Sequence, residues 1–93
     1  MRFSDLKPGD KITRMLGGAV AMEMTVFAVN DTRIFCVVAD APEPLGLEAK
    51  DFDEEMWPGW TFCRKTGAEI DEELGWGPEF GVTGSFLKLE GHP

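Results

Sequence analysis

Alternation of apolar and polar residues at a period of two dominates this chain, and it predicts short β-strands separated by turns. The first predicted strand covers residues 11–16 and follows a turn at Pro8-Gly9. Residues 22–29 and 33–39 form the arms of a predicted hairpin, because both are rich in β-branched and aromatic residues. Its turn, Asn30-Asp31-Thr32, contains residue types that bond back to their own backbone.

The second half of the chain contains a long acidic segment before the strand pattern resumes. Residues 40–59 hold three prolines, two glycines and seven acidic residues, which predict an exposed loop. A second hairpin then turns at Lys65-Thr66-Gly67, and a closing strand covers residues 82–89 with a bend at Gly84. Five to six short strands and no long helix predict a single all-β domain, a small antiparallel SH3-like barrel or roll.

The stretch "TGAEIDEELGWG", residues 66–77, allows two interpretations. Thr66 and Glu69 have capping-box spacing and Gly75 could end a short helix. A helix of about eight residues is short for one that depends on packing. We therefore favour a strand over residues 68–71 that passes into a single turn, with Glu69, Asp71 and Glu73 on one face.

Composition and charge narrow the cellular setting and the partners. The chain has 93 residues and a net charge of −8, with the acidic excess in residues 40–93. No apolar run approaches the roughly 20 residues that span a bilayer, and no signal-peptide pattern follows Met1, so we expect a cytoplasmic protein. Without a basic face we expect no nucleic acid and no membrane partner. Cys36 and Cys63 lie in apolar strand-like segments and are predicted to be free thiols.

Motifs for ordinary catalysis and for cofactors are missing from the sequence. The single histidine, His92, is two residues from the end, where no triad can be built around it. The glycine-rich stretches lack the lysine of a P-loop and the dinucleotide fingerprint. The acids of residues 66–77 do not have the spacing of a calcium loop. We therefore expect no cofactor and no metal, and more readily a non-enzyme than an enzyme.

The candidate binding residues combine tryptophans with nearby charges. Trp57 and Trp76 each lie close to glycine, where an indole can line a groove or an interface, or simply pack. They are grouped here with Arg64 and the acids Glu69, Asp71 and Glu73 as a possible ligand or partner surface. Arg64 and Glu69 flank a turn and could also pair across the hairpin.

Residues 33–39 are apolar on both faces of their strand, which usually means that both faces are covered. Phe27, Phe35 and Val37 on the second face exceed what one short loop readily covers, so we expect a homo-oligomer. The first functional hypothesis is a non-enzymatic interaction module with a protein or small-molecule partner. The alternative is a small hydrolase or lyase with Glu69, Asp71 or Glu73 as general base, which requires a buried carboxylate.

Three stretches, "PGDKITRMLGG", "WTFCRKTGAEIDEELGWG" and "TGSFL", resemble a group of small bacterial proteins of unassigned function, some of them carried on mobile gene cassettes. The resemblance covers most of the chain except the acidic loop, and the block from Trp60 to Trp76 is its most specific part. The pattern has an acidic residue at the position of Cys63. The resemblance implies a bacterial cytoplasmic protein and brings no activity, cofactor or catalytic residue.

Overall fold

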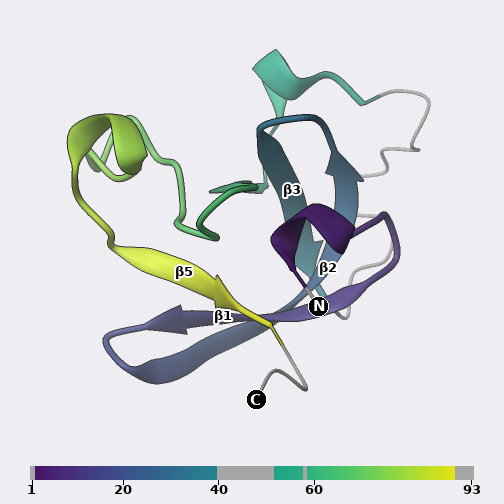
Figure 1. Ribbon diagram of the computed structural model, residues 1–93, viewed down its shortest axis with the longest axis horizontal. Coiled ribbons are helices and arrows are strands. Elements are labelled where there is room, and N and C mark those ends of the chain that lie inside the picture. Colours follow the sequence, from purple (N-terminus) through teal and green to yellow (C-terminus); the bar gives the residue numbers. More distant parts are fainter. Residues whose placement is uncertain (1, 40–51, 58, 90–93) are drawn as a thin grey trace.

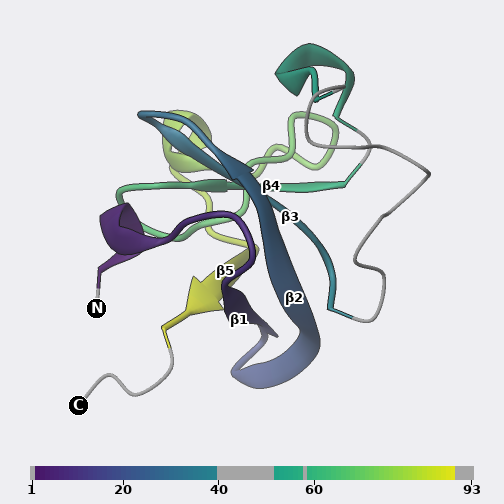
Figure 2. The ribbon, with the colours of Figure 1, turned by 90° about the vertical axis from the view of Figure 1, so that its right-hand side faces the viewer.

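The computed structural model describes residues 2–39, 52–57 and 59–89, and they form one strongly curled antiparallel sheet (Figures 1 and 2). Its strands are β1 (Lys11–Leu16), β2 (Ala19–Val29), β3 (Arg33–Val38), β4 (Trp60–Cys63) and β5 (Ser85–Lys88), in the order β4-β3-β2-β1-β5. In the described parts of the chain the helical elements are single 3-10 turns, η1 (Phe3–Asp5), η4 (Glu54–Met56) and η5 (Pro78–Phe80). The predicted all-β fold, a small antiparallel SH3-like barrel or roll of five to six strands, is confirmed, with five strands in the sheet.

Strand β2 begins at Ala19, three residues before the predicted arm of residues 22–29, because the turn that precedes it is tight. Gly17 and Gly18 both adopt positive φ angles, 62° and 83°, which closes a two-residue turn and pairs Leu16 directly with Ala19. The next turn forms as predicted: the Asn30 side-chain oxygen accepts hydrogen bonds from the backbone N–H groups of Thr32, at 2.9 Å, and Arg33, at 2.7 Å.

The long strand β2 belongs to both halves of the curl, pairing with β1 near its start and with β3 near its end (Figure 2). Its register with β3 shifts between Val26 and Ala28, so Phe27 has no partner in the ladder. A bulge of this kind bends a strand and increases its twist. The sheet therefore curls round one core, formed by the buried side chains of Leu6, Ile12, Met24, Val26, Ile34, Cys36, Phe62 and Leu87.

Residues 67–70, which we call the seam segment, join the two edges of the sheet. Their backbone hydrogen bonds alternate between β4 and β5, at 2.7 to 2.9 Å. Toward β4, the N–H of Cys63 donates to the carbonyl of Ala68 and the N–H of Ile70 donates to that of Thr61. Toward β5, the N–H of Glu69 donates to the carbonyl of Ser85 and the N–H of Leu87 donates to that of Gly67. The segment is therefore extended, as predicted, and the helical interpretation is wrong. It forms isolated bridges because successive residues bond to different strands.

The second face of the β2–β3 hairpin is covered within the chain, so the argument that it needs another subunit is wrong. Phe35 is 1% exposed, and its ring centroid lies 4.8 Å from that of Phe52. Trp57 stacks on Phe27 at 5.0 Å and meets Phe52 at 5.5 Å. Two aromatic side chains cover this face because each buries about 150–250 Å². We call Phe27, Phe35, Phe52 and Trp57 the aromatic cover.

The predicted acidic loop is described only at its end. Residues 40–51 and 58 lie outside the described residues, whereas residues 52–57 carry η4 and half of the aromatic cover. The predicted closing strand is shorter than expected, since β5 begins at Ser85. Across the described residues, no helix is long and apolar enough to cross a membrane.

Candidate functional site

Glu69 is the one predicted site acid that the fold places in the interior. The residue is 4% exposed, and its Oε1 lies 2.9 Å from Nε of Arg14 on β1. The same oxygen accepts a hydrogen bond from the Ser85 hydroxyl at 2.7 Å, and Arg14 Nε also reaches that hydroxyl at 3.1 Å. This buried triad links β1, the seam segment and β5, so its evident role is to hold the seam segment, which also bonds to β4, against β1 and β5.

The expected pair between Arg64 and Glu69 does not form. Arg64 instead donates to three backbone carbonyls, those of Asn30 at 2.6 Å, Ser4 at 2.9 Å and Leu6 at 3.3 Å. The reason is that Glu69 points inward to Arg14, whereas Arg64 extends toward η1 and the β2–β3 turn. Arg64 thus ties the N-terminal segment to the hairpin, and its buried Nε has no hydrogen-bond partner.

Asp71 and Glu73 do not converge with Glu69 on one site. Asp71 Oδ1 accepts from the N–H groups of Glu73 at 3.0 Å and Leu74 at 3.2 Å, which closes the turn after the seam segment. Glu73 itself is exposed. Within the described ranges, no three His, Cys, Asp or Glu side chains form a group that could hold a metal ion.

The two candidate tryptophans lie in separate environments and both pack. Trp57 belongs to the aromatic cover and donates from Nε1 to the carbonyl of Trp60 at 3.1 Å. Trp76 is half-buried, and a Cβ atom placed on Gly84 would overlap its indole ring. Gly84 is therefore the residue that lets the chain pass beneath Trp76. The predicted surface of tryptophans and acids is not assembled as a single site.

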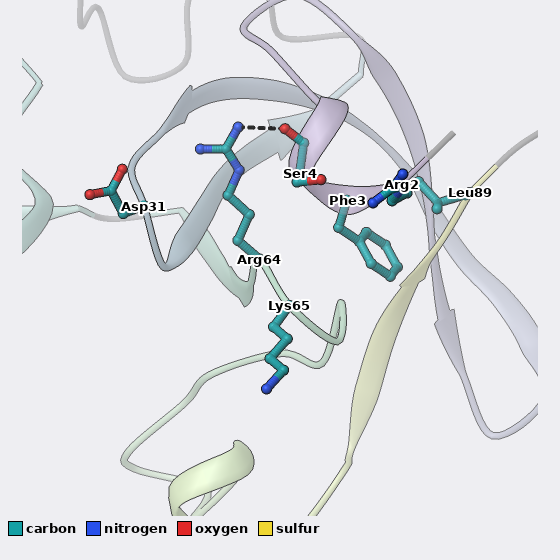
Figure 3. Close-up of a pocket in the computed structure, with 7 residues that line it drawn as sticks. All are labelled: Arg2, Phe3, Ser4, Asp31, Arg64, Lys65 and Leu89. Atoms are coloured by element: carbon teal, nitrogen blue, oxygen red, sulfur yellow. Dashed lines mark hydrogen bonds between the residues drawn. The ribbon is translucent and has the colours of Figure 1, made fainter.

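A pocket that the sequence did not reveal opens beside η1 (Figure 3). It has a volume of about 710 Å³ and is lined by Arg2, Phe3, Ser4, Asp31, Arg64, Lys65 and Leu89, which we call the basic pocket. These residues come from the N-terminal segment, the β2–β3 turn, the turn after β4 and the end of β5. Arg2-Phe3-Ser4 and Arg64-Lys65 are each adjacent along the chain, but nothing in the local sequence shows that the curl of the sheet brings the two groups together.

Cys63 lines a smaller pocket of about 270 Å³ with Arg33, Ile70 and Phe80 among its other residues. Partial burial raises the pKa of this thiol, but hydrogen bonds from the Thr66 hydroxyl and from the backbone N–H groups of Thr66 and Lys65, together with the Lys65 charge, bring it below its ordinary value. Burial raises the pKa of the Cys36 thiol to about 12. Both cysteines are free, Cys36 buried and Cys63 half-buried, so we expect thiolate to form more readily at Cys63 than at Cys36.

This difference predicts selective labelling. A thiol reagent at pH 7.5 should modify Cys63 in the native protein and reach Cys36 only after unfolding, since a lower pKa gives more thiolate. Thr66→Val removes a hydrogen-bond donor and should slow the labelling of Cys63 several-fold, whereas Lys88→Ala, with a side chain outside this pocket, should leave the rate unchanged. Mass spectrometry of the labelled peptides checks this, and equal labelling of both native thiols would contradict it.

Comparisons with protein-family models, curated proteins and solved structures found no match for this chain.

Proposed function

We propose that this chain is a cytoplasmic, non-enzymatic interaction module that self-associates through one face of its sheet. The observation that carries the proposal is a row of outward-facing apolar residues in direct register. Met15 on β1 pairs with Val20 on β2 and with Phe86 on β5. Val20 is 61% exposed and Phe86 is 37% exposed. Contiguous exposed apolar surface of this kind marks interaction sites in soluble proteins.

The orientation of this row follows from strand alternation. Arg14 meets Glu69 inside the curled sheet and pairs with the buried Leu87 on β5, so Met15 and its β5 partner Phe86, one position along in an unshifted register, lie on the outer face. Val20 pairs with Met15 across a register shift on β2, and its exposure places it on the same face. Phe86 continues the row to Val82, which is 47% exposed, across a groove of about 330 Å³ that both line. We call Met15, Val20, Val82 and Phe86 the apolar strip.

Charges at one end of the apolar strip favour a second copy as its occupant. Glu23 and Lys88 both pair with Thr13, on opposite sides of β1, and both are exposed. A two-fold axis parallel to β1 reverses the order of strands across the interface. It therefore sets Glu23 of each copy opposite Lys88 of the other while the apolar strips meet. Two-fold pairs are the commonest closed assemblies, and such charge pairs set register.

The enzymatic alternative has one supporting observation, the burial of Glu69. Its Oε1 is already held by Arg14 and Ser85, and Glu69 is not among the residues that line the three pockets described here. The carboxylate of Asp71 accepts a backbone hydrogen bond in a turn, and Glu73 is exposed. A buried polar triad that joins strands supports a structural role. The two free thiols support a reducing compartment such as the cytoplasm.

Sedimentation equilibrium at micromolar concentration tests self-association. The wild-type chain should have twice the monomer mass, and Phe86→Lys should shift it to the monomer because a charge would be buried at the centre of the interface. Val38→Lys is a matched control, since Val38 is equally exposed, at 37%, but lies outside the apolar strip. It should leave the dimer intact. A monomeric wild type would contradict the proposal, and so would equal dissociation of the Phe86→Lys and Val38→Lys variants.

A further inference from the structure

The basic pocket concentrates positive charge in a strongly acidic chain. Three of the chain's nine Lys and Arg side chains line it, with Asp31 as its one carboxylate, whereas the whole chain has 17 acidic residues. The lining therefore has a formal charge of +2. A chain with a net charge of −8 repels anions at long range. Any attraction of an anion to this pocket therefore comes from the charges that line it.

In the described parts of the chain, Arg14 and Glu69 form the one ion pair within 4 Å. Arg2, Arg64 and Lys65 therefore have no acidic side chain paired with them there. Arg64 is held in place by carbonyl groups, which fix its guanidinium without neutralising its charge. Arg2 and Lys65 are exposed. In Figure 3 Lys65 extends away from the guanidinium of Arg64, and exposed side chains of this kind change rotamer within nanoseconds.

The pocket also has an apolar wall. The ring of Phe3 and the side chain of Leu89 are half-buried and line the same space as the cations. Figure 3 shows the Phe3 ring between Arg64 and Lys65 on one side and Arg2 and Leu89 on the other. The ring is held by the seam, because Gly67, which has a φ angle of 79°, leaves the space that Phe3 fills. A ligand with an apolar group can therefore lie against a fixed surface beside fixed charge.

We propose that the basic pocket binds a small phosphate monoester whose organic group is apolar. A phosphate monoester has a charge between about −1.5 and −2 at pH 7, close to the charge of the lining. Its oxygens accept from the guanidinium of Arg2 and the ammonium of Lys65, which close from the rim. Arg64, whose two Nη2 N–H groups and one Nη1 N–H donate to carbonyls, adds its fixed charge and its remaining Nη1 N–H. The organic group lies on Phe3 and Leu89. This site is separate from the apolar strip and does not depend on self-association.

Isothermal titration calorimetry with phenyl phosphate at low ionic strength tests the proposal. We expect saturable binding of phenyl phosphate. Inorganic phosphate and phenol should each bind several-fold more weakly, because the first lacks the apolar group and the second lacks the phosphate. Arg2→Ala and Lys65→Ala should each lower the affinity for phenyl phosphate about three- to fivefold, which is the effect of losing one solvent-exposed ion pair. Asp31→Asn should raise the affinity for phenyl phosphate, since the lining then loses its only carboxylate.

Lys11→Ala is the matched control, because Lys11 is exposed, bonds to Thr25 across the sheet and does not line the pocket. It removes the same charge and should leave binding unchanged. Equal weakening by Lys11→Ala would mean diffuse charge attraction and would overturn the assigned site. Absence of saturable binding by the folded wild-type chain would overturn the proposal, and inorganic phosphate binding as tightly as phenyl phosphate would overturn the role of the apolar wall.

Discussion

Glu69→Gln should lower the free energy of unfolding by about 3 kcal/mol, since removing one partner of a buried ion pair leaves the other charge uncompensated. The side chains of Arg14 and Glu69 are only 11% and 5% exposed, so water cannot replace the lost carboxylate charge. The substitution also weakens the link between the seam segment and β5, because the same oxygen accepts from Ser85. Urea unfolding followed by tryptophan fluorescence measures the loss.

Two further variants separate this interpretation from a general effect of removing acids. Glu73→Gln changes an exposed carboxylate in the same stretch and should alter stability by no more than about 0.5 kcal/mol. Replacing Arg14 by Met and Glu69 by Leu together removes both buried charges and should cost less than Glu69→Gln alone. If Glu69→Gln were as mild as Glu73→Gln, the buried triad would not hold the seam segment against β1 and β5.

Phe35→Ala should lower the free energy of unfolding by about 3 to 5 kcal/mol, the range for truncating a phenylalanine in a core. Phe35 is 1% exposed and contacts both Phe52 and Trp57, so its removal leaves a cavity beneath the aromatic cover. A domain of this size is stable by only about 5–15 kcal/mol, so the variant should unfold at much lower urea concentration. Near-ultraviolet circular dichroism should also lose its aromatic signal.

Phe80→Ala provides the comparison, because Phe80 is 47% exposed on η5 and should change stability by less than about 1 kcal/mol. The folded fraction of Phe35→Ala should retain the wild-type assembly state, since the apolar strip lies elsewhere on the sheet. A mild loss of stability combined with loss of the dimer would mean that another subunit, rather than residues 52–57, covers this face.

Local signals in the sequence were sufficient for most of the fold. The residue types that set turns, Gly17-Gly18, Asn30 and Gly67, determine where the chain reverses, and alternation between them assigns residues to faces. The extended conformation predicted from residue 68 is correct, because this backbone bonds to β4 and β5. The bounds differ at two strands: β2 begins at Ala19, directly after the Gly17-Gly18 turn, and β5 begins at Ser85, directly after Gly84.

Partners distant in sequence could not be predicted in the same way. Periodicity places Glu69 on a face, but nothing in it shows that Arg14, 55 positions away, lies opposite. The same limit applies to Arg64, whose acceptors are carbonyl groups that carry no sequence signal. Phe52 and Trp57 lie at the end of a stretch whose composition predicts an exposed loop, and nothing in that composition shows that the two rings return over Phe27 and Phe35.

The proposed assembly rests on the apolar strip and on the charges beside it, and these charges offer a test that leaves the apolar residues unchanged. Glu23→Lys and Lys88→Glu each place like charges opposite one another across the proposed two-fold axis, so each should weaken the dimer. The double variant restores opposite charges in exchanged positions and should recover it. Both residues are exposed, so the fold of each variant should survive.

Sedimentation equilibrium on these four proteins is therefore the most direct test of whether the chain is a self-associating module. We expect twice the monomer mass for the wild type and the double variant, and a mass shifted toward the monomer for each single variant. A monomeric wild type would contradict self-association, and single variants as dimeric as the wild type would contradict the interface.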